Sequence, residues 1–500
     1  MAKFDFNPKT YEKKLQPLIK ELAAGKNYDQ VLRRFPKTAT TLFTKAEVIS
    51  GLRYFNYPPS LVAKPVRTLS GVVPVTLLTK PYPCPGRCLY CPNDPRMPKS
   101  YLPNEPGGQR AVANQFNPYR QVISRLKTYQ ANGHPTDKIE LIILGGTWSA
   151  YPRAYQIWFI KRCFEALNGQ KSVSLAVAQK INETATNRCV GLSLETRPDW
   201  ITKPELIRFR HLGCTKVQIG IQSLSDRILK LNQRGHTVAA TKKAIKLLRL
   251  YGFKIQAHWM ANLYGATPKT DIADFKKLFS DKNFRPDELK IYPCSLIKSA
   301  PLYLYYQKNL WRPYTQSELI KVLTQTLPLV PPYCRVSRMI RDFSASDIVS
   351  GNKTSNLRQL VEQKTTNKIK EIRFREIRNE PWKNLTLKII SYQTSVGEEK
   401  FLQWVTEKNK LCAFLRLSLP KNKTTAMIRE LHVYGQALAL GGQARVQHAG
   451  LGKKLIMRAA QIAKKFKYQR VRVISSVGTR EYYRRLGFID RQLYQSLTID

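Results

Sequence analysis

Acidic residues are scarce in this sequence. Its 500 residues hold 34 Asp and Glu against 84 Lys and Arg, which leaves a formal net charge of +50. A positive field of this size favours polyanions, meaning nucleic acid or an anionic membrane surface. Long apolar runs are missing too, since none reaches the roughly 18 residues that span a bilayer. We therefore expect a polyanionic partner and no membrane.

The beginning of the chain has no apolar stretch of the kind found in a signal peptide. Nine cysteines, an odd number with three of them in one loop, do not fit a secreted disulfide framework. The expected location is a reducing cytoplasm. A hydrophobic content of 43% is ordinary for a globular protein, and the length allows two or three domains with full cores.

Three thiols lie close together in Cys84-Pro-Gly-Arg-Cys88-Leu-Tyr-Cys91, directly after an apolar run. This spacing lets one loop wrap a single metal centre. Three thiolates can hold three irons of a 4Fe–4S cube and leave the fourth iron open, whereas a closed cluster or a structural zinc site needs four ligands. The motif is similar to that of radical S-adenosylmethionine (SAM) enzymes. The alternative is a zinc loop completed by a distant histidine such as His134.

The pattern of the chain changes several times along its length. We predict a basic helical segment at residues 1–65, a βα region at 66–343, a polar connector at 344–379 and a hairpin-rich αβ domain at 380–500. The first segment contains short helices, at Tyr11–Ala24 and around Val31–Tyr54. The expected strands of the βα region are Val72–Leu78, Ile139–Leu144, Cys189–Leu194, Thr215–Ile221, Phe253–His258 and Glu288–Tyr292. Amphipathic helices between them predict an α/β fold in which a parallel sheet curls into a partial or complete barrel.

Polar and glycine residues gather where these strands end, which is where barrel enzymes place their chemistry. The second strand ends in Gly145-Gly146, where missing side chains would let a ligand approach the backbone. The third ends in Glu195, Arg197 and Asp199, which could hold ribose and carboxylate groups or form only a salt-bridged loop. His258, on the fifth strand, fits either a site residue or a satisfied core histidine.

The C-terminal domain carries a second motif. The loop Gln447-His-Ala-Gly450-Leu-Gly452-Lys453 fits the Q/R-x-x-G-x-G pattern of GNAT-type acetyltransferases and opens the expected helix Leu451–Phe466. Backbone N–H groups and the helix dipole at such a position favour a pyrophosphate. A strand at Ala426–Tyr434 comes before the loop, and the pair Tyr482-Tyr483 follows it. The pattern predicts coenzyme A binding.

Together, the two domains resemble the Elongator protein 3 family in its single-chain bacterial or archaeal form, from Pro74 to Phe488. The segments that carry the resemblance are the cysteine loop, Asp137-Lys138, Gly145-Gly146-Thr147, Gly191–Asp199, Gly220–Ser223, Asn232–Thr237, Phe284–Asp287, Ile291–Pro293, Arg429–Gly435 and the tyrosine pair. The resemblance implies an acyltransferase that converts the wobble uridine (position 34) of tRNA to 5-carboxymethyluridine. In the mechanism it implies, a cluster-derived electron cleaves SAM, the 5′-deoxyadenosyl radical activates the methyl group of acetyl-CoA, and the resulting radical adds to uracil C5.

The resemblance also assigns residues. Cys84, Cys88 and Cys91 would hold the cluster, and Gly145, Gly146, Glu195 and Arg197 would surround SAM. Acetyl-CoA would contact Lys138, Glu430, Leu431, His432, Val433, Gln447, Gly450, Leu451, Gly452, Lys453 and Tyr483. Lys138, Tyr482 and Tyr483 are the further catalytic candidates. An electron donor to the cluster is implied, whereas partner subunits are not required.

Two features depart from the family pattern. Asn93-Asp94 stands where many relatives have two glycines, which could alter how the cysteine loop frames SAM. Some relatives have been proposed to hold a metal between the domains, and Cys294 and Cys334 are the nearby thiols here. Two thiols without a clear histidine partner are more typical of a core, so we assign no zinc site to them and leave the question of an interdomain metal open.

For tRNA, the basic N-terminal helices are the expected contact, through Lys13, Lys14, Arg33, Arg34, Lys37 and Arg53. Such contacts would follow phosphates and be sensitive to salt. An anticodon loop is single-stranded, so presenting one base costs less than flipping it from a duplex. Two alternatives stay open: a protein lysine acetyltransferase with the barrel as scaffold, and a non-enzymatic tRNA-binding scaffold with a structural cluster.

Overall fold

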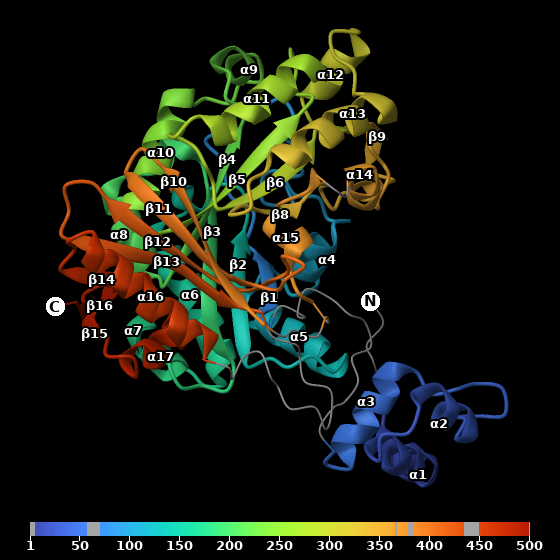
Figure 1. Ribbon diagram of the computed structural model, residues 1–500. Coiled ribbons are helices and arrows are strands. Elements are labelled where there is room, and N and C mark those ends of the chain that lie inside the picture. The colour runs from blue at the N-terminus through green and yellow to red at the C-terminus, as the bar shows by residue number, and fades with distance from the viewer. Residues whose placement is uncertain are drawn as a thin grey trace.

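The computed structural model describes residues 6–57, 71–365, 368–378, 380, 384–434 and 450–499. A small helical module at the N-terminus stands beside a larger body (Figure 1), and its helix α3 lies closest to α5 of that body. Within the described part of the chain, no helix is long and apolar enough to cross a membrane.

The N-terminal module has a small core of its own. It comprises η1 (Pro8–Tyr11), α1 (Glu12–Ala23), α2 (Tyr28–Arg34) and α3 (Lys45–Tyr54). Leu15, Leu18 and Val48 are among its buried residues. The helical stretch predicted around residues 31–54 is two helices, because Pro36 lacks the N–H that a continuing helix needs and disfavours helical geometry in the preceding residue. Thr44 then starts α3 with a capping box to Glu47.

The predicted parallel sheet is confirmed. Its strands are β1 (Val73–Leu78), β2 (Lys138–Leu144), β3 (Arg188–Thr196), β4 (Lys216–Gln222), β5 (Lys254–Ala261), β6 (Glu288–Pro293) and β8 (Arg335–Arg338). They form one seven-stranded sheet in the order β1-β2-β3-β4-β5-β6-β8, parallel throughout. β1 and β8 are the two edges, so the barrel is partial. β8 was not predicted, because its sequence Arg-Val-Ser-Arg contains no apolar run.

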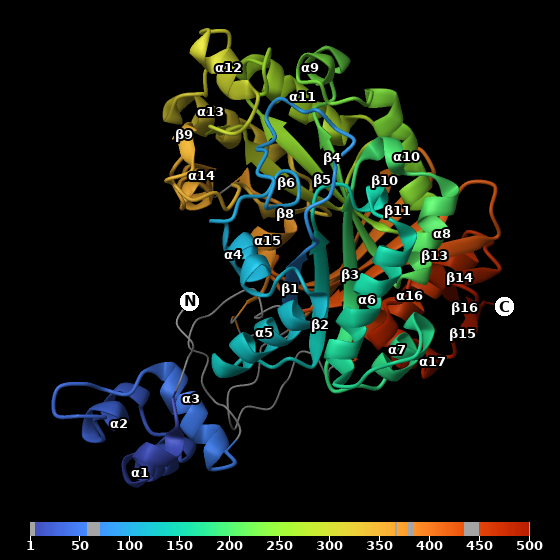
Figure 2. The ribbon, with the colours of Figure 1, turned by 180° about the vertical axis from the view of Figure 1, so that it is seen from behind.

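Helices cover the outer face of this sheet (Figure 2). The helices of this domain are α4 (Pro106–Ala113), α5 (Pro118–Ala131), α6 (Arg153–Asn168), α7 (Leu175–Asn182), α8 (Lys203–His211), α9 (Asp226–Leu231), α10 (Val238–Leu250), α11 (Pro268–Ser280), α12 (Leu302–Gln307) and α13 (Gln316–Thr326). Short 3-10 turns lie at η3 (Trp148–Ala150), η4 (Pro198–Trp200) and η5 (Leu327–Leu329). Asn117 is the N-cap of α5 and accepts a hydrogen bond from the backbone N–H of Arg120.

The C-terminal domain is built on a second seven-stranded sheet, in the order β10-β11-β12-β13-β14-β16-β15. Its elements are β10 (Thr386–Gln393), β11 (Gly397–Val405), β12 (Leu411–Pro420), β13 (Thr425–Val433), α16 (Leu451–Lys465), β14 (Arg470–Val473), η7 (Val477–Thr479), α17 (Arg480–Arg484), β15 (Ile489–Arg491) and β16 (Tyr494–Thr498). The predicted strand Ala426–Tyr434 corresponds to β13 and the predicted helix Leu451–Phe466 to α16, and β13 pairs in parallel with β14, which follows α16.

The segment predicted as a polar connector is more than a surface link. It contains β9 (Ile348–Ser350), which pairs with β7 (Leu296–Ile297), and the helices α14 (Leu357–Thr365) and α15 (Ile372–Arg375). Leu357, Val361 and Ile372 are buried in the main core. The pattern was missed because these apolar side chains are spaced at helical intervals among charged residues.

A buried charge network joins the two large domains. Arg429 of β13 donates to both carboxylate oxygens of Asp287, at 2.7 and 2.6 Å, and to Glu399 at 2.9 Å. The side chains of Arg429 and Asp287 are fully buried. Arg416 of β12 lies 3.6 Å from Asp287 and donates to Glu430 at 2.7 Å. The two sheets are therefore held in one relative position.

Acid is expected to weaken this joint. Burial alone would raise the pKa of Asp287, but the charges of Arg429 and Arg416 outweigh it and hold the pKa below its usual range. At another contact between the domains, burial is outweighed by hydrogen bonds from Arg484, Lys180 and Arg480, which lower the pKa of Glu183 to about 2. A lowered carboxyl pKa contributes stability above the unfolded pKa, and this contribution is lost as the pH falls through the folded pKa.

We therefore expect the free energy of unfolding to fall between about pH 4.5 and pH 2. Thermal unfolding at a series of pH values would measure this. A Glu183→Gln variant should be less stable than the parent at neutral pH and less sensitive to acid. An unchanged acid dependence in the variant would contradict the assignment.

Candidate active site

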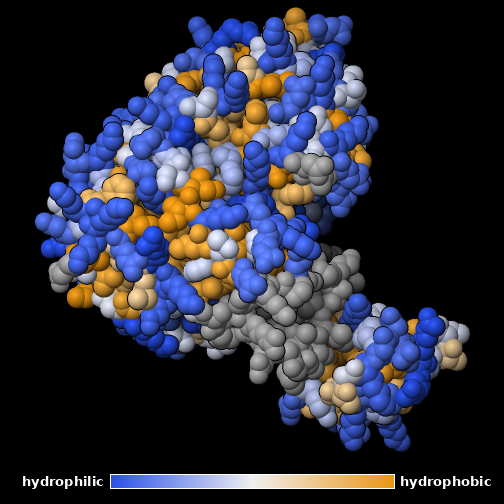
Figure 3. All heavy atoms as spheres, in the orientation of Figure 1, coloured by the Kyte–Doolittle hydropathy of each residue, from blue (hydrophilic) through white to orange (hydrophobic). Residues whose placement is uncertain are grey.

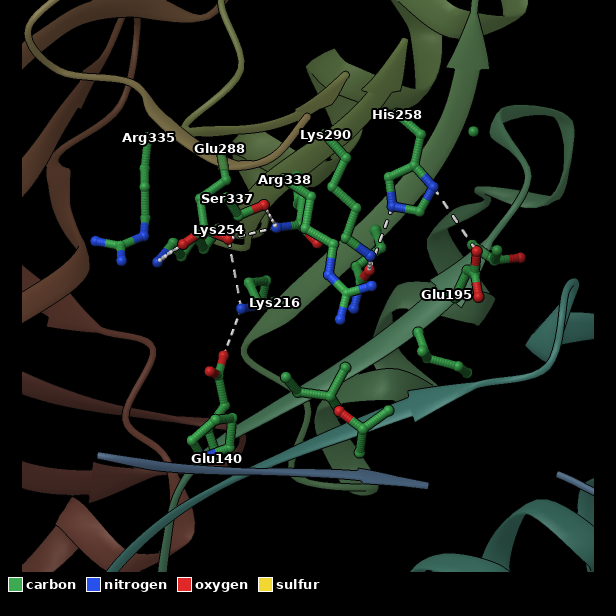
Figure 4. Close-up of a pocket in the computed structure, with 18 of the residues that line it drawn as sticks. Glu140, Glu195, Lys216, Lys254, His258, Glu288, Lys290, Arg335, Ser337 and Arg338 are labelled. Atoms are coloured by element: carbon green, nitrogen blue, oxygen red, sulfur yellow. Dashed lines mark hydrogen bonds and ion pairs between the residues drawn. The ribbon is translucent and has the colours of Figure 1, made fainter. Parts of the chain in front are cut away.

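One cavity of about 370 Å³ lies inside the half-barrel, between the sheet and the C-terminal domain. Its lining includes Cys84, Cys88 and Cys91 near the carboxyl ends of the strands and Tyr483 and Thr479 from the C-terminal domain. A barrel interior is usually packed with branched apolar side chains. Here the inward positions of the strands carry charged and polar side chains, and the space between them is hollow (Figure 4).

The three predicted cluster ligands face this cavity together. Cys88 is 3% exposed, and Arg234 donates from Nη1 to its Sγ at 3.5 Å. A hydrogen bond from Cys91, and then the charge of Arg234, hold the pKa of Cys88 well below its usual range. Cys84 Sγ lies 3.6 Å from Thr147 Oγ1. Three cysteine thiols that face one cavity from a single loop are the donor set that iron–sulfur clusters take, so these residues fit a 4Fe–4S cluster.

The zinc alternative relied on His134, which the structure places elsewhere. His134 is buried edge-on against Tyr129, with 5.6 Å between the ring centroids, and is not part of the cavity lining. Cys294 and Cys334 are also buried. In the described part of the chain, no three His, Cys, Asp or Glu side chains gather as the ligands of a single metal ion.

The Gly145-Gly146 turn lies next to the cysteine loop and requires glycine. Gly145 has φ +149°, and a Cβ there would stand 1.8 Å from Thr79 Oγ1. Gly146 has φ +84° and lines the cavity. The turn thus presents bare backbone to the space beside Cys84, as the sequence predicts.

Glu195 and Arg197 also line the cavity. Glu195 accepts a hydrogen bond from Tyr101 at 2.8 Å and lies 3.7 Å from His258 Nδ1. Arg197 is held by Asp199, with Nε and Nη2 each 3.0 Å from a carboxylate oxygen. Its buried Nη1 has no hydrogen-bond partner among the described residues. An unpaired buried donor of this kind is costly unless a ligand satisfies it.

His258 belongs to the site. Its Nε2 lies 3.2 Å from Gln218 Oε1, which also accepts from Lys290 at 2.6 Å. Burial, and then the charge of Lys290, lower the pKa of His258 well below its usual range, so the imidazole is neutral. Figure 4 shows the His258 ring between Glu195 on one side and Lys290 on the other.

A series of lysine–glutamate ion pairs, called the charge ladder below, crosses the middle of the cavity; its members are Glu140, Lys216, Glu288, Lys254 and Glu430. Lys216 pairs with Glu140 and lies 3.5 Å from Glu288. Lys254 pairs with Glu288 at 2.6 Å and with Glu430 of the C-terminal domain. Glu140 of β2 reaches Lys216 of β4 over the intervening strand because Gly191 of β3 has no side chain, and a Cβ there would stand 3.2 Å from Glu140 Cγ.

Sequence reasoning did not find this ladder, the hydrogen bond from Arg234 to Cys88 or the hydrogen bond from Tyr101 to Glu195. Each residue is unremarkable in its own segment. One available signal was a charged side chain at an inward position of an otherwise apolar strand, as Glu140 is in the run Lys-Ile-Glu-Leu-Ile-Ile-Leu.

The structure separates the two tyrosines of the C-terminal motif. Tyr483 is 6% exposed and lines the cavity, whereas Tyr482 is 41% exposed. A Cβ on Gly452 would lie 2.7 Å from the hydroxyl of Tyr482, so this tyrosine covers the first turn of α16. Gly450 begins that helix with φ +68°.

Only some of the other predicted coenzyme A contacts line the cavity. Glu430, Leu431 and His432 line the cavity, with the Glu430 carboxylate engaged by Lys254 and Arg416. Val433, Leu451, Lys453 and Lys138 are not part of its lining. Gln447 lies outside the described residues. The coenzyme roles of all these residues stay predictions.

The basic residues predicted to contact tRNA in the N-terminal module fall into two groups, those held by partners within the module and those that are exposed. Arg34 is paired with Glu21 at 2.8 Å, Lys37 with Glu47 at 2.6 Å, and Lys14 donates to the carbonyl of Lys37. Lys13, Arg33 and Arg53 are exposed. Figure 3 shows hydrophilic side chains over much of this module and of the main body.

Comparison with known proteins agrees with this architecture. Residues 82–280 match the radical SAM superfamily, 286–367 the radical SAM C-terminal domain and 366–488 the acetyltransferase (GNAT) family. The chain is 42% identical over 443 residues to the tRNA uridine(34) acetyltransferase of Dehalococcoides mccartyi, covering 84% of this chain and 96% of that protein. It is 33% identical over 465 residues to human Elongator complex protein 3, covering 86% and 84%. The solved archaeal Elp3 of Methanocaldococcus infernus, lacking residues 1–46, superposes with a TM-score of 0.76 at 37% identity over 86% of this chain and 99% of that one.

Proposed function

This chain belongs to the family of the tRNA uridine(34) acetyltransferases and Elongator complex protein 3, and from this we propose that it converts the wobble uridine of tRNA to 5-carboxymethyluridine, using acetyl-CoA and a SAM-derived radical. The observation that carries the proposal is the single cavity with the three thiols at one end and Tyr483 at the other. A radical formed at one end and an acetyl group delivered at the other can meet there without passing through solvent.

When bound, the 4Fe–4S cluster would supply the electron that cleaves SAM to a 5′-deoxyadenosyl radical. Cys84, Cys88 and Cys91 would hold it. The Gly145-Gly146 backbone and the carboxylate of Glu195 would bind the amino and ribose groups of SAM, since Gly146 and Glu195 both line the cavity beside the cysteine loop. The unpaired Nη1 of Arg197 would donate a hydrogen bond to an anionic group of the ligand.

The inner residues keep this reaction space polar and organised. Gln218, neutral His258 and Lys290 present donors and acceptors suited to the carbonyl and N–H groups of uracil. Lys216 and Lys254, each already paired with glutamates, can stabilise the carboxylate that thioester hydrolysis creates. Tyr483, buried at the far end, is placed to orient the thioester carbonyl or the attacking water.

The test is nucleoside mass spectrometry on tRNA. Protein reconstituted under anaerobic conditions would be incubated with unmodified tRNA, SAM, acetyl-CoA and a strong reductant. We expect a 5-carboxymethyluridine peak that disappears when SAM or acetyl-CoA is omitted. Acetyl-CoA turnover stimulated by lysine peptides but not by tRNA would instead favour a protein acetyltransferase. Retained tRNA binding without any SAM cleavage would favour a scaffold.

Gly145→Ala is expected to weaken SAM binding by at least about tenfold, roughly 1.4 kcal/mol. The added Cβ would collide with Thr79 Oγ1, so the turn must move away from the cysteine loop. Isothermal titration of SAM into the reconstituted protein would measure the change. The matched control is Gly169→Ala, which also has positive φ but nothing within 4 Å of the new Cβ. Equal SAM affinities in both variants would remove this turn from the SAM site.

The proposed substrate brings further expectations with it. tRNA is the polyanion that the net charge of +50 predicts, with Lys13, Arg33 and Arg53 as the exposed phosphate contacts of the N-terminal module. A cytoplasmic location follows from a tRNA substrate. Because the radical and acetyltransferase parts share one cavity in one chain, partner subunits are not required, but a donor of electrons to the cluster is.

A further inference from the structure

A stack of aromatic side chains leads from the cysteine loop to the surface of α6. Tyr82, two residues before Cys84, stacks on Tyr151 with 4.8 Å between ring centroids and 30° between planes. Tyr151 stacks on Tyr155 at 5.2 Å and 22°. Tyr155 contacts Trp158 at 5.6 Å and 34°. Tyr151 is 4% exposed and Trp158 is 42% exposed, so the stack runs from the interior to solvent.

The stack is held in place by hydrogen bonds. The Tyr151 hydroxyl lies 2.7 Å from Thr79 Oγ1 and donates to the carbonyl of Lys80 at 2.8 Å. The Tyr155 hydroxyl accepts from the backbone N–H of Lys80 at 3.1 Å. The residues directly after β1 therefore fasten both rings to the strand that leads into the cysteine loop.

The stack approaches the cysteine loop from outside the reaction cavity. Cys84 lines that cavity, but Tyr82, Tyr151, Tyr155 and Trp158 do not. SAM, acetyl-CoA and uridine would reach the thiols from within the half-barrel. The packed rings of the aromatic stack reach the same loop by a second route, which these substrates would not occupy.

The outer end of the stack has an apolar centre and a basic rim. Ile157, 47% exposed, adjoins Trp158 on α6. Arg153 and Lys80 are exposed beside the stack, and Lys80 Nζ lies 5.2 Å from the centre of the Tyr155 ring. Arg153 also borders a surface hollow with Trp200. The charges of that hollow's other lining residues are balanced, since Arg208 pairs with Glu205 and Asp199 with Arg197. An aromatic and aliphatic centre within a cationic rim is suited to a small, transient interface with an acidic protein.

We propose that Trp158 and this basic rim form the docking site of an acidic one-electron carrier protein of the flavodoxin type, and that the stack from Trp158 to Tyr82 is the packed path by which its electron reaches the cluster. The proposal rests on the proposed function, which requires this electron. One electron leaves the reduced flavin of the carrier and enters the 4Fe–4S cluster, and no bond or proton is exchanged between the proteins. The rings act as a bridging medium and are not themselves reduced.

RNA is the other class of partner that a basic surface with an aromatic side chain could take. A single-strand platform needs several accessible ring faces on which successive bases stack. Here Tyr151 is buried, and the faces of Tyr151 and Tyr155 are occupied by their neighbours in the stack. The observations therefore favour the protein carrier.

The experiment measures cluster reduction directly. Full-length protein with a reconstituted cluster would be mixed with reduced flavodoxin in an anaerobic stopped-flow instrument, without SAM, acetyl-CoA or tRNA, and the loss of visible cluster absorbance recorded. We expect Trp158→Ala and Arg153→Glu to slow reduction at subsaturating flavodoxin by about tenfold or more. Trp158→Phe should keep most of the rate, and added salt should reduce the difference between Arg153→Glu and the parent.

Two controls distinguish a loss of flavodoxin docking from a loss or alteration of the cluster itself. Dithionite, which needs no docking site, should reduce all variants at the same rate, and their iron content should match the parent. Lys243→Glu makes the same charge change at an exposed position of α10 and should leave the flavodoxin rate near that of the parent.

Equal flavodoxin rates in the parent, Trp158→Ala and Arg153→Glu would overturn the proposal. So would a parent protein that dithionite reduces and flavodoxin does not. A loss of tRNA affinity in Trp158→Ala with unchanged reduction would assign the surface to RNA instead. The reduction assay contains no substrate, so its result does not depend on the proposed function. If flavodoxin reduces the cluster normally but the separate tRNA assay yields no 5-carboxymethyluridine, the proposed function is contradicted and the docking site is still supported.

Discussion

Replacing Cys88 by alanine is expected to reduce 5-carboxymethyluridine formation to background while tRNA binding persists. Cys88 lies in the middle of the three-thiol motif, is 3% exposed and receives a hydrogen bond from Arg234. A cube held by two thiolates would have two incompletely ligated irons and would lose iron to solvent. Without the cluster no electron reaches SAM, so no radical forms. The phosphate contacts proposed for the N-terminal module do not involve the cysteine loop, so tRNA affinity should be largely unaffected.

Three measurements on Cys88→Ala would check this result. Iron per protein chain and visible cluster absorbance should fall strongly, SAM cleavage should stop, and tRNA affinity should stay within about twofold of the parent. The control is Cys163→Ala, which removes a fully buried thiol from α6 outside the cavity. It should cost stability, as a buried deletion does, but should retain iron and activity. Product formation by Cys88→Ala would disprove a cluster-dependent radical reaction.

The second large effect is expected at the domain joint. Asp287→Ala would leave Arg429 fully buried with only Glu399 as its close acidic partner. Breaking a buried pair by removing one partner costs about 3–5 kcal/mol, because the remaining charge stays desolvated. Since Asp287 also accepts the backbone N–H of Ile255 at 2.9 Å, the end of β5 would lose a hydrogen bond as well.

Urea unfolding of Asp287→Ala, followed by a probe in each domain, would measure this loss. Lys242→Ala provides the exposed counterpart, because it removes a pair with Asp281 in which the lysine is 42% exposed. A surface pair contributes about 0–1 kcal/mol, so this control should unfold near the parent. Arg429→Met combined with Asp287→Asn should recover part of the loss, since neither charge is then left alone. Comparable stabilities for Asp287→Ala and Lys242→Ala would show that the buried network does not hold the domains together.

The parts of the site that could be predicted from the sequence each consist of residues that are close together in the chain. The cysteine loop, the Gly145-Gly146 turn and the strand–loop–helix pattern around Gly450 each place their chemistry within a short segment. In such segments spacing alone restricts geometry, so three thiols within eight positions must face a common centre. The alternation of strands and helices likewise predicted the parallel sheet, because burial of one face imposes a period on each element.

The parts that could not be predicted depend on distant segments. Glu140, Lys216 and Glu288 meet because β2, β4 and β6 turn their inward faces to one hollow, and no spacing along the chain encodes that meeting. Arg234 reaches Cys88 across 146 positions of sequence. The strand β8 was missed because its pairing with β6, and not its composition, makes it a strand.

The sequence by itself thus indicated the two chemistries and the order of the domains and predicted a polyanionic partner, since ligand spacing, periodicity and net charge are properties of the chain. Only the tertiary structure decided that both chemistries open into one cavity, that Tyr483 lines it while Tyr482 is half exposed over α16, and that an aromatic stack connects the cysteine loop to the surface. These are relations between side chains far apart in the chain, and packing of the two sheets and their helices brings those side chains together.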